Sequence, residues 1–286
     1  MKHSLKVANR FGDATDTQRY STLNTVEEME TEGNCCFALS RDMRGVAYLD
    51  IRAGKINVLG VSEMESLIRA ITEIKEDDII RCLVVTGGND RAWIGGANIK
   101  EMVKLDPATA REFISRVNDL CESVRTLSVP VIAAINGWCL GMGVEFAAAC
   151  DIRVASTVSQ FAMPEVKLGI PSVVHAAMLP RQIGAGRTRS WLLTGRAVDA
   201  TVAHTWGLLD DVVRPENLDA AVEDIVSAII ECPAEAIRTQ KALCNAWEEL
   251  PLTEAIQMSI GPFGDAFLTD EPGMAMRAFL AKKLGN

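Results

Sequence analysis

The sequence has no apolar run long enough to cross a membrane and no stripe of basic residues. A membrane-spanning helix needs about 20 consecutive apolar residues, and the apolar runs of this chain are much shorter. Its formal net charge of −9 disfavours nucleic-acid binding through neutralised phosphates. We therefore expect neither a membrane nor a nucleic acid as partner.

The cysteines follow no spacing typical of a zinc site, and several lie inside apolar runs, where a thiol behaves as a small hydrophobic group. We expect them to be reduced, as in a reducing compartment. The first residues lack the apolar centre of a secretory signal, so we predict a cytoplasmic protein. The eight cysteines are Cys35, Cys36, Cys82, Cys121, Cys139, Cys150, Cys232 and Cys244.

Length and composition predict a sizeable core, because 48% of the 286 residues are hydrophobic. Residues 1–34 are polar and are expected to form an extension. Short apolar runs alternate with amphipathic segments through residues 35–213, an order typical of an α/β fold. Residues 214–286 read as a series of helices.

The segment from residue 130 to 171 combines the parts of a site that moves protons. The apolar run Val131–Ile135 predicts a buried strand. Gly141 and Gly143 then lead into a helix, whose first turn contains Glu145. A second carboxylate, Glu165, follows in a loop. Either acid could instead have an ordinary place, Glu145 at the favourable end of a helix dipole and Glu165 on a surface loop.

A second loop, residues 89–98, places three small residues in succession, Gly95, Gly96 and Ala97. Small side chains leave a backbone N–H accessible to a ligand oxygen. An ordinary glycine turn is the alternative interpretation.

Together these motifs resemble the crotonase superfamily, and specifically its enoyl-CoA hydratase branch, over residues 36 to 286. The resemblance implies an α/β spiral of repeated ββα units, followed by a C-terminal helical region that assembles a homotrimer or a dimer of trimers. The motifs are AWIGGANIKEM (92–102), PVIAAINGWCLGMGVEFAAACDI (130–152), SQFAMPEVKLGIP (159–171), LLTGR (192–196) and FLAKK (279–283).

The resemblance implies that water is added to a 2-enoyl-CoA without metal or redox cofactor, coenzyme A being part of the substrate. The backbone N–H groups of Ala97 and Met142 would form an oxyanion hole. Glu145 would activate water, and Glu165 would give a proton to C2, which requires burial to raise its pKa. Met142 departs from the family's usual glycine, but this change keeps the N–H.

The resemblance also implies a set of substrate-binding residues. Lys55 and Lys282 would meet the CoA phosphates, although solvated lysines are an equally ordinary interpretation. His175 could bind a polar acyl substituent or be structural. The full set is Lys55, Gly95, Gly96, Asn98, Ile99, Trp138, Gly141, Phe161, Pro164, Ser172, His175, Phe279 and Lys282.

The chain departs most clearly from the family at residues 172–176, SVVHA, where a glycine-rich segment is usual. Bulkier residues there should reshape the acyl pocket, but none of them indicates which acyl group it binds. Two other functions stay open: an enoyl-CoA isomerase of the same fold, which needs only one carboxylate, and a non-catalytic assembly or RNA-binding protein.

Overall fold

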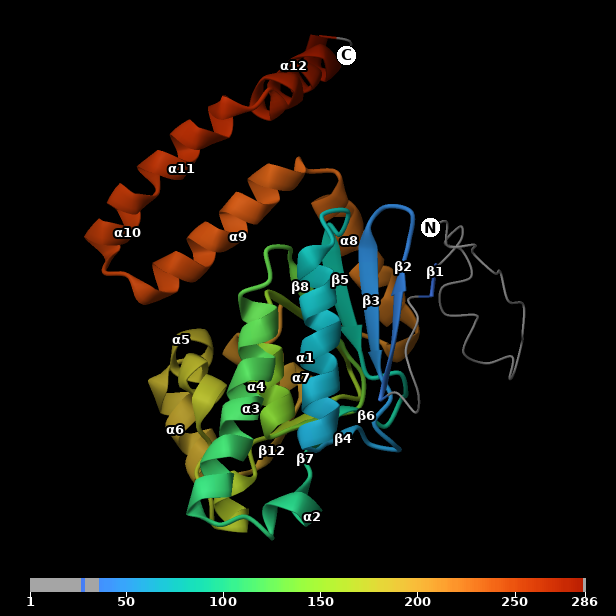
Figure 1. Cartoon of the computed structure of the whole chain (residues 1–286), viewed down its shortest axis with the longest axis vertical. Helices are drawn as coiled ribbons and strands as arrows, with labels where there is room; N and C mark the ends of the chain where they lie inside the picture. The colour runs from blue at the N-terminus through green and yellow to red at the C-terminus, as the bar shows by residue number, and fades with distance from the viewer. Residues whose placement is uncertain (1–26, 29–35, 285–286) are drawn as a thin grey trace, which may run out of the picture.

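A seven-stranded sheet forms the centre of the molecule in the computed structural model, which describes residues 27–28 and 36–284 (Figure 1). The strand order is β1-β2-β3-β5-β8-β10-β13, parallel from β3 onwards. Runs such as CLVVT and VIAAI are wholly buried, as strands covered on both faces must be. The strands are β1 (Glu27–Glu28), β2 (Phe37–Arg41), β3 (Val46–Ile51), β5 (Cys82–Thr86), β8 (Val131–Ile135), β10 (Ile152–Ser156) and β13 (Asp211–Val213).

Shorter strands form two further sheets, of order β12-β11-β9-β6 and β4-β7. Successive strands of the main sheet are followed by a short strand and then by a helix, so the predicted ββα repeat and α/β spiral are confirmed. The short strands are β4 (Val58–Leu59), β6 (Ala92–Ile94), β7 (Gly96–Ala97), β9 (Trp138–Leu140), β11 (Gln160–Ala162) and β12 (Ala197–Asp199).

Three helices, α1, α3 and α4, cover one face of the main sheet (Figure 1). The helix α3 begins at Pro107, where proline suits the first helical position, and Asp106 caps it. The helices of this part are α1 (Val61–Glu76), α2 (Ile99–Met102), α3 (Pro107–Arg125), α4 (Met142–Ala149), α5 (Leu179–Ile183), α6 (Ala185–Thr194) and α7 (Ala200–Trp206), with 3-10 turns η1 (Glu165–Leu168) and η2 (Val174–Met178).

The opposite face of the sheet is covered by α8 (Leu218–Ile230), after the 3-10 turn η3 (Pro215–Asn217). Leu218, Val222 and Val226 of α8 are buried against the sheet. By its packing this helix belongs to the core, although the sequence analysis grouped it with the later helices. Within residues 27–28 and 36–284, no helix is long and apolar enough to span a membrane.

Helices α9 to α12 extend from the core as an arm (Figure 1). A buried lysine joins the arm to the core: Lys241 Nζ lies 3.2 Å from Val124 O, at the end of α3, and 2.7 Å from Asp151 Oδ2. Asp151 also accepts the Val131 N–H at 2.7 Å, so it fixes the start of β8. The arm consists of α9 (Ala234–Glu249), α10 (Leu252–Met258), α11 (Ile260–Asp265), η4 (Ala266–Leu268) and α12 (Glu271–Leu284).

Candidate functional site

Glu145 lies in the first turn of α4, a helix whose residues are all buried. The helix begins after Gly141, whose carbonyl accepts the N–H groups of Val144 at 2.8 Å and Glu145 at 3.2 Å. Only 4% of the surface of Glu145 is exposed. Burial and, to a smaller extent, the negative charge of Glu165 together raise the pKa of its carboxyl to about 8. The free protein therefore keeps Glu145 largely protonated at neutral pH.

Glu165 is brought to the same place by the short strands. β11 pairs with β9, and the Gly141 N–H donates to Ala162 O at 2.8 Å, so the chain after β11 returns past the start of α4. A Cβ atom on Gly141 would overlap Glu165 Oε1. The second carboxyl thus lies directly against the turn that begins α4. Burial raises the pKa of Glu165, while its own N–H and the Ser172 hydroxyl oppose that shift.

One turn contacts both carboxyls. The backbone N–H groups of Ala176 and Val173 act on the Glu145 carboxyl and partly offset the rise in its pKa. The Ser172 hydroxyl donates to Glu165 Oε2 at 2.8 Å. Residues 172–176, which the sequence analysis identified as the departure from the family, therefore connect the two acids.

The two expected backbone donors lie on adjacent segments. Ala97 ends β7, which pairs with β4, and the next residue, Asn98, donates its N–H to Leu59 O at 2.9 Å. Gly96 has φ of +104°, and a Cβ there would lie 3.3 Å from Leu140 O, just before Gly141. The loop around Ala97 therefore lies against the segment that begins α4.

Met142 is the first residue of α4, so its N–H has no acceptor within the helix. Its side chain is 4% exposed and lies in the hydrophobic core. The departure from glycine is thus accommodated by packing, and the amide keeps its place at the helix start.

The remaining predicted residues divide into those near the carboxyls and those apart from them. Asn98 caps α2 by accepting the Lys100 N–H at 3.1 Å. Ile99, Trp138 and Lys55 are exposed, Pro164 and Ser172 are half-buried, and Gly95 packs against Ile56 O. Phe279 and Lys282 lie on α12, at the far end of the arm from α4 in the same chain (Figure 1).

Two predicted binding residues are buried. Phe161 is 0% exposed and part of the core, so its side chain has no surface open to a ligand. His175 is also buried, and its Nε2 lies 2.9 Å from Glu122 Oε1. Burial lowers the pKa of His175, against the opposing effect of Glu122. Sequence reasoning missed Glu122, because nothing near it in α3 indicates a partner from another segment.

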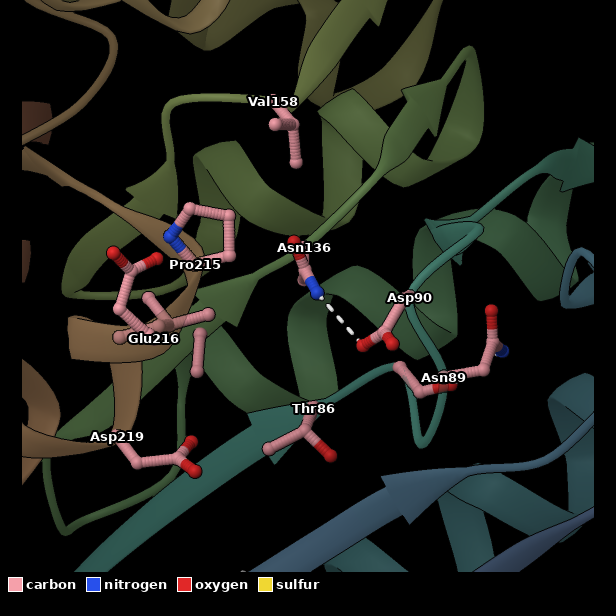
Figure 2. A pocket seen from close by; sticks show the side chains of 11 residues that line it. Thr86, Asn89, Asp90, Asn136, Val158, Pro215, Glu216 and Asp219 are labelled. Atoms are coloured by element: carbon pink, nitrogen blue, oxygen red, sulfur yellow. Dashed lines mark hydrogen bonds between the residues drawn. The ribbon is translucent and has the colours of Figure 1, made fainter.

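A separate hollow of about 450 Å³ lies at the carboxyl ends of β5, β8 and β13 (Figure 2). Asn136 and Asp90 face one another there, with Nδ2 and Oδ1 3.0 Å apart. None of the predicted site residues lines it. Its lining is Thr86, Gly87, Asn89, Asp90, Ala134, Asn136, Val158, Pro215, Glu216, Leu218 and Asp219.

The site holds acids and backbone donors rather than a metal centre. Among the described residues, no group of three or more His, Cys, Asp or Glu side chains is arranged to hold a metal ion. All cysteines within this part of the chain are outside disulfide bonds. The arrangement can accept a proton at one carboxyl and donate one from the other.

Known proteins resemble this chain over most of its length. The chain is 33% identical over 242 residues to the crotonyl-CoA hydratase of Syntrophomonas wolfei, covering 84% of this chain and 93% of the relative. It is 31% identical over 240 residues to the short-chain-enoyl-CoA hydratase of Clostridium acetobutylicum, covering 83% and 92%.

Among solved structures, the enoyl-CoA hydratase of Bacillus anthracis superposes with a TM-score of 0.82 at 28% identity, covering 86% of this chain and 96% of that one. The model of the enoyl-CoA hydratase/isomerase family matches residues 41–285. The chain therefore belongs to the enoyl-CoA hydratase/isomerase family.

Proposed function

We propose that the protein is an enoyl-CoA hydratase, a hydro-lyase that adds water across the C2–C3 double bond of a 2-enoyl-CoA thioester. The observation that carries this proposal is the pair of adjacent carboxyls, buried Glu145 and half-buried Glu165: the charge of Glu165 raises the pKa of Glu145, and one turn supports both. A pair in this state holds one proton near neutral pH, and hydration needs one acid and one base.

The two carboxyls account for both proton transfers of the hydration. One carboxylate takes a proton from water as the water oxygen bonds to C3, and the other carboxyl gives its proton to C2. The thioester oxygen becomes an enolate in between, and we propose that the N–H groups of Ala97 and Met142 stabilise it. Such a donor lowers the barrier by about 3–4 kcal/mol. No electrons are transferred, so we propose that no redox cofactor takes part.

The resting proton lies on Glu145, since the pKa of this carboxyl is about 8. The division of roles implied by family resemblance has Glu145 activate water and Glu165 protonate C2. That division requires the proton to lie on Glu165 once water and thioester are bound. For the free protein we therefore propose only that the two carboxyls share one proton. We propose that Glu145 acts as the base and Glu165 as the acid once substrate and water are bound.

Binding of the CoA part and assembly of subunits belong together in this proposal. Lys55 is exposed beside the loop that carries Ala97, whereas Lys282 lies on α12. We propose that Phe279 and Lys282 reach a site in a neighbouring subunit of a homotrimer or a dimer of trimers. Large exposed apolar side chains on the arm support assembly: they are Leu252, Ile256, Ile260, Phe263, Phe267, Leu268, Met274, Met276, Phe279 and Leu280.

A cytoplasmic location completes the proposal. It is supported by the thiols of the described residues, which form no disulfide bond and are the state that a reducing compartment maintains.

The test is the loss of the conjugated-thioester absorbance of crotonyl-CoA over time. Glu165→Gln should lower kcat by about 1,000-fold or more while CoA-ester binding changes little, because the substitution removes an acid–base group and keeps its shape. Glu112→Gln, an exposed acid on α3, is the matched control. Turnover of Glu165→Gln at the wild-type rate would contradict the proposal.

The same assay separates the alternatives. An isomerase would convert a 3-enoyl-CoA to the conjugated ester, so absorbance would rise rather than fall. A non-catalytic protein would leave both esters unchanged. A panel of short, branched and aromatic enoyl-CoA esters would then define the acyl group.

A further inference from the structure

The turn formed by residues 172–176 determines where both carboxyls lie. The Ser172 hydroxyl donates to Glu165 Oε2 at 2.8 Å, and the backbone N–H groups of Val173 and Ala176 favour the ionised form of Glu145. A displacement of this short segment would therefore change the surroundings of both acids together. The contacts that hold the turn in place therefore affect the acid–base chemistry proposed for the two carboxyls.

The backbone of the turn is strained at Val174. Its φ is +38°, in the left-handed region that glycine adopts readily and that is unfavourable for a β-branched residue. Such a conformation persists only where the surrounding structure holds it. The Ala176 N–H donates to Val173 O at 2.9 Å, which closes the turn but lies within it. An attachment to another element is still required.

His175 supplies that attachment. Its side chain is 6% exposed, and Nε2 lies 2.9 Å from Glu122 Oε1 on α3. Glu122 is itself held by Arg125, whose Nε and Nη2 donate to its two oxygens at 2.9 and 3.1 Å. Although burial acts against it, this pairing with Arg125 keeps the pKa of Glu122 below its ordinary value. A charged acceptor makes the bond to His175 a strong one.

The hydrogen-bonding pattern fixes the form of the imidazole. A carboxylate can only accept, so Nε2 of His175 carries the proton and donates it to Glu122. Nδ1 is then a buried acceptor without a hydrogen-bond partner among the residues that the structure describes. The imidazole therefore makes its one protein hydrogen bond to Glu122, and the turn depends on that bond.

We infer that His175 is a positioning residue: its bond to Glu122 holds residues 172–176 in the strained conformation that presents two N–H groups to Glu145. This inference rests on the proposed function in that the hydration chemistry is assigned to Glu145.

The electrostatic consequence has a definite sign. Glu165 is the charged group that acts on Glu145, together with the backbone N–H groups of the turn and the Cys121 thiol. The charged groups that act on His175 are Glu122 and Arg125. The two N–H donors favour the ionised form of Glu145. Release of the turn removes them, so the pKa of Glu145 should rise.

The test compares His175→Ala with His175→Gln, whose side-chain amide can place an N–H near the position of imidazole Nε2. Protein labelled with ¹³C at glutamate carboxyls is titrated by NMR, and Glu145→Gln identifies the signal. In His175→Ala the apparent pKa of Glu145 should rise by about one unit. The kcat for crotonyl-CoA hydration should fall about tenfold with KM unchanged within about twofold. His175→Gln should restore both.

Variants of the partner residues provide the controls. Glu122→Ala should reproduce the effects of His175→Ala, and the double variant should lose no more than either single one, because the residues act through one bond. Glu249→Ala removes a carboxylate that contacts Arg125 at 3.1 Å from α9, and should leave the Glu145 titration unchanged.

The outcomes separate this inference from the proposed function. A wild type that hydrates crotonyl-CoA, with His175→Ala titrating and turning over like it, overturns the inference and leaves the function standing. A wild type that hydrates no enoyl-CoA, with the Glu145 signal still shifted in His175→Ala, overturns the function and supports the inference. If His175→Ala does not fold, an unchanged Glu145 titration in Glu122→Ala overturns the inference.

Discussion

Two sides of the site reach unusual backbone conformations by different means. On one side, Gly96 has φ of +104° and Gly141 has φ of +52°, and both lie where a Cβ would meet another atom of the site. On the other side, Val174 has φ of +38° in a turn without glycine. The first side needs no support for these angles, whereas the second is braced by His175 and Glu122.

The comparison shows two ways in which a turn beside these carboxyls can hold a left-handed backbone angle. Glycine is required at Gly141 because both the backbone angle and the contact with Glu165 exclude a side chain. At Val174 only the angle is unfavourable, so a side chain is tolerated once a neighbour anchors the turn. Replacing glycine on the first side should therefore be more harmful than its control substitution, whereas introducing glycine at Val174 should be less harmful than its control.

The largest effect is expected for Gly141→Ala. The new Cβ would displace the Glu165 carboxyl, and the backbone angle would be strained as well. A misplaced catalytic group commonly costs about 100-fold in rate, and we expect at least that loss in kcat for crotonyl-CoA. Gly186→Ala is the control, because a Cβ there meets nothing within 4 Å. Equal activity of the two variants would contradict the proposed contact.

Next in size is the effect of Glu145→Gln on stability. The pKa of Glu145 is raised from 4.5 to about 8 on folding, so the native state binds the extra proton and stability falls as pH rises between these values. Each unit corresponds to about 1.4 kcal/mol. Burial of the new amide offsets part of this gain, so the free energy of unfolding of Glu145→Gln at pH 8 should be about 2 kcal/mol higher than that of the wild type.

Urea unfolding at pH 5 and pH 8 measures this difference. At pH 5 the gain should largely vanish, because Glu145 is then protonated in the folded protein. A gain of the same size at both pH values would indicate a cause other than the carboxyl charge.

A smaller effect is expected in the pH dependence of turnover. Activity needs one proton on the pair, so it should fall as pH rises through about 8, where Glu145 loses its proton. It should also fall at low pH, where both carboxyls are protonated. One unit above the upper pKa, kcat/KM should be about tenfold below its maximum. A profile that is flat from pH 7 to pH 10 would exclude the shared-proton arrangement.

The smallest effect compares two neighbouring valines. Val174→Gly relieves a strained angle, whereas Val173 is extended with φ of −139° and gains nothing from glycine. Both changes remove the same side chain. Val174→Gly should therefore destabilise the fold by about 1 kcal/mol less than Val173→Gly, measured by urea unfolding at one pH. The reverse order would mean that Val174 is not strained.

Much of the fold could be predicted because its signals are local. The buried run Val131–Ile135, the glycines before α4 and the proline that begins α3 each determine their own structure.

The site was predictable in its carboxyls and unpredictable in what holds them. His175 and Glu122 are 53 residues apart in sequence and meet only after α3 packs against η2. The positive φ of Val174 has no residue signature, since valine avoids that region. Similarly, the high pKa of Glu145 arises from burial in α4, a property of the assembled core rather than of any motif.

The complete burial of α4 also decides where the protein can be redesigned. A helix with no solvent-facing position transmits any change in side-chain volume to the carboxyl in its first turn. The chain beside Glu165 is different, because Val166, Leu168 and Ile170 are exposed. Libraries that seek new acyl preferences should therefore vary that outer strip and leave the helix untouched.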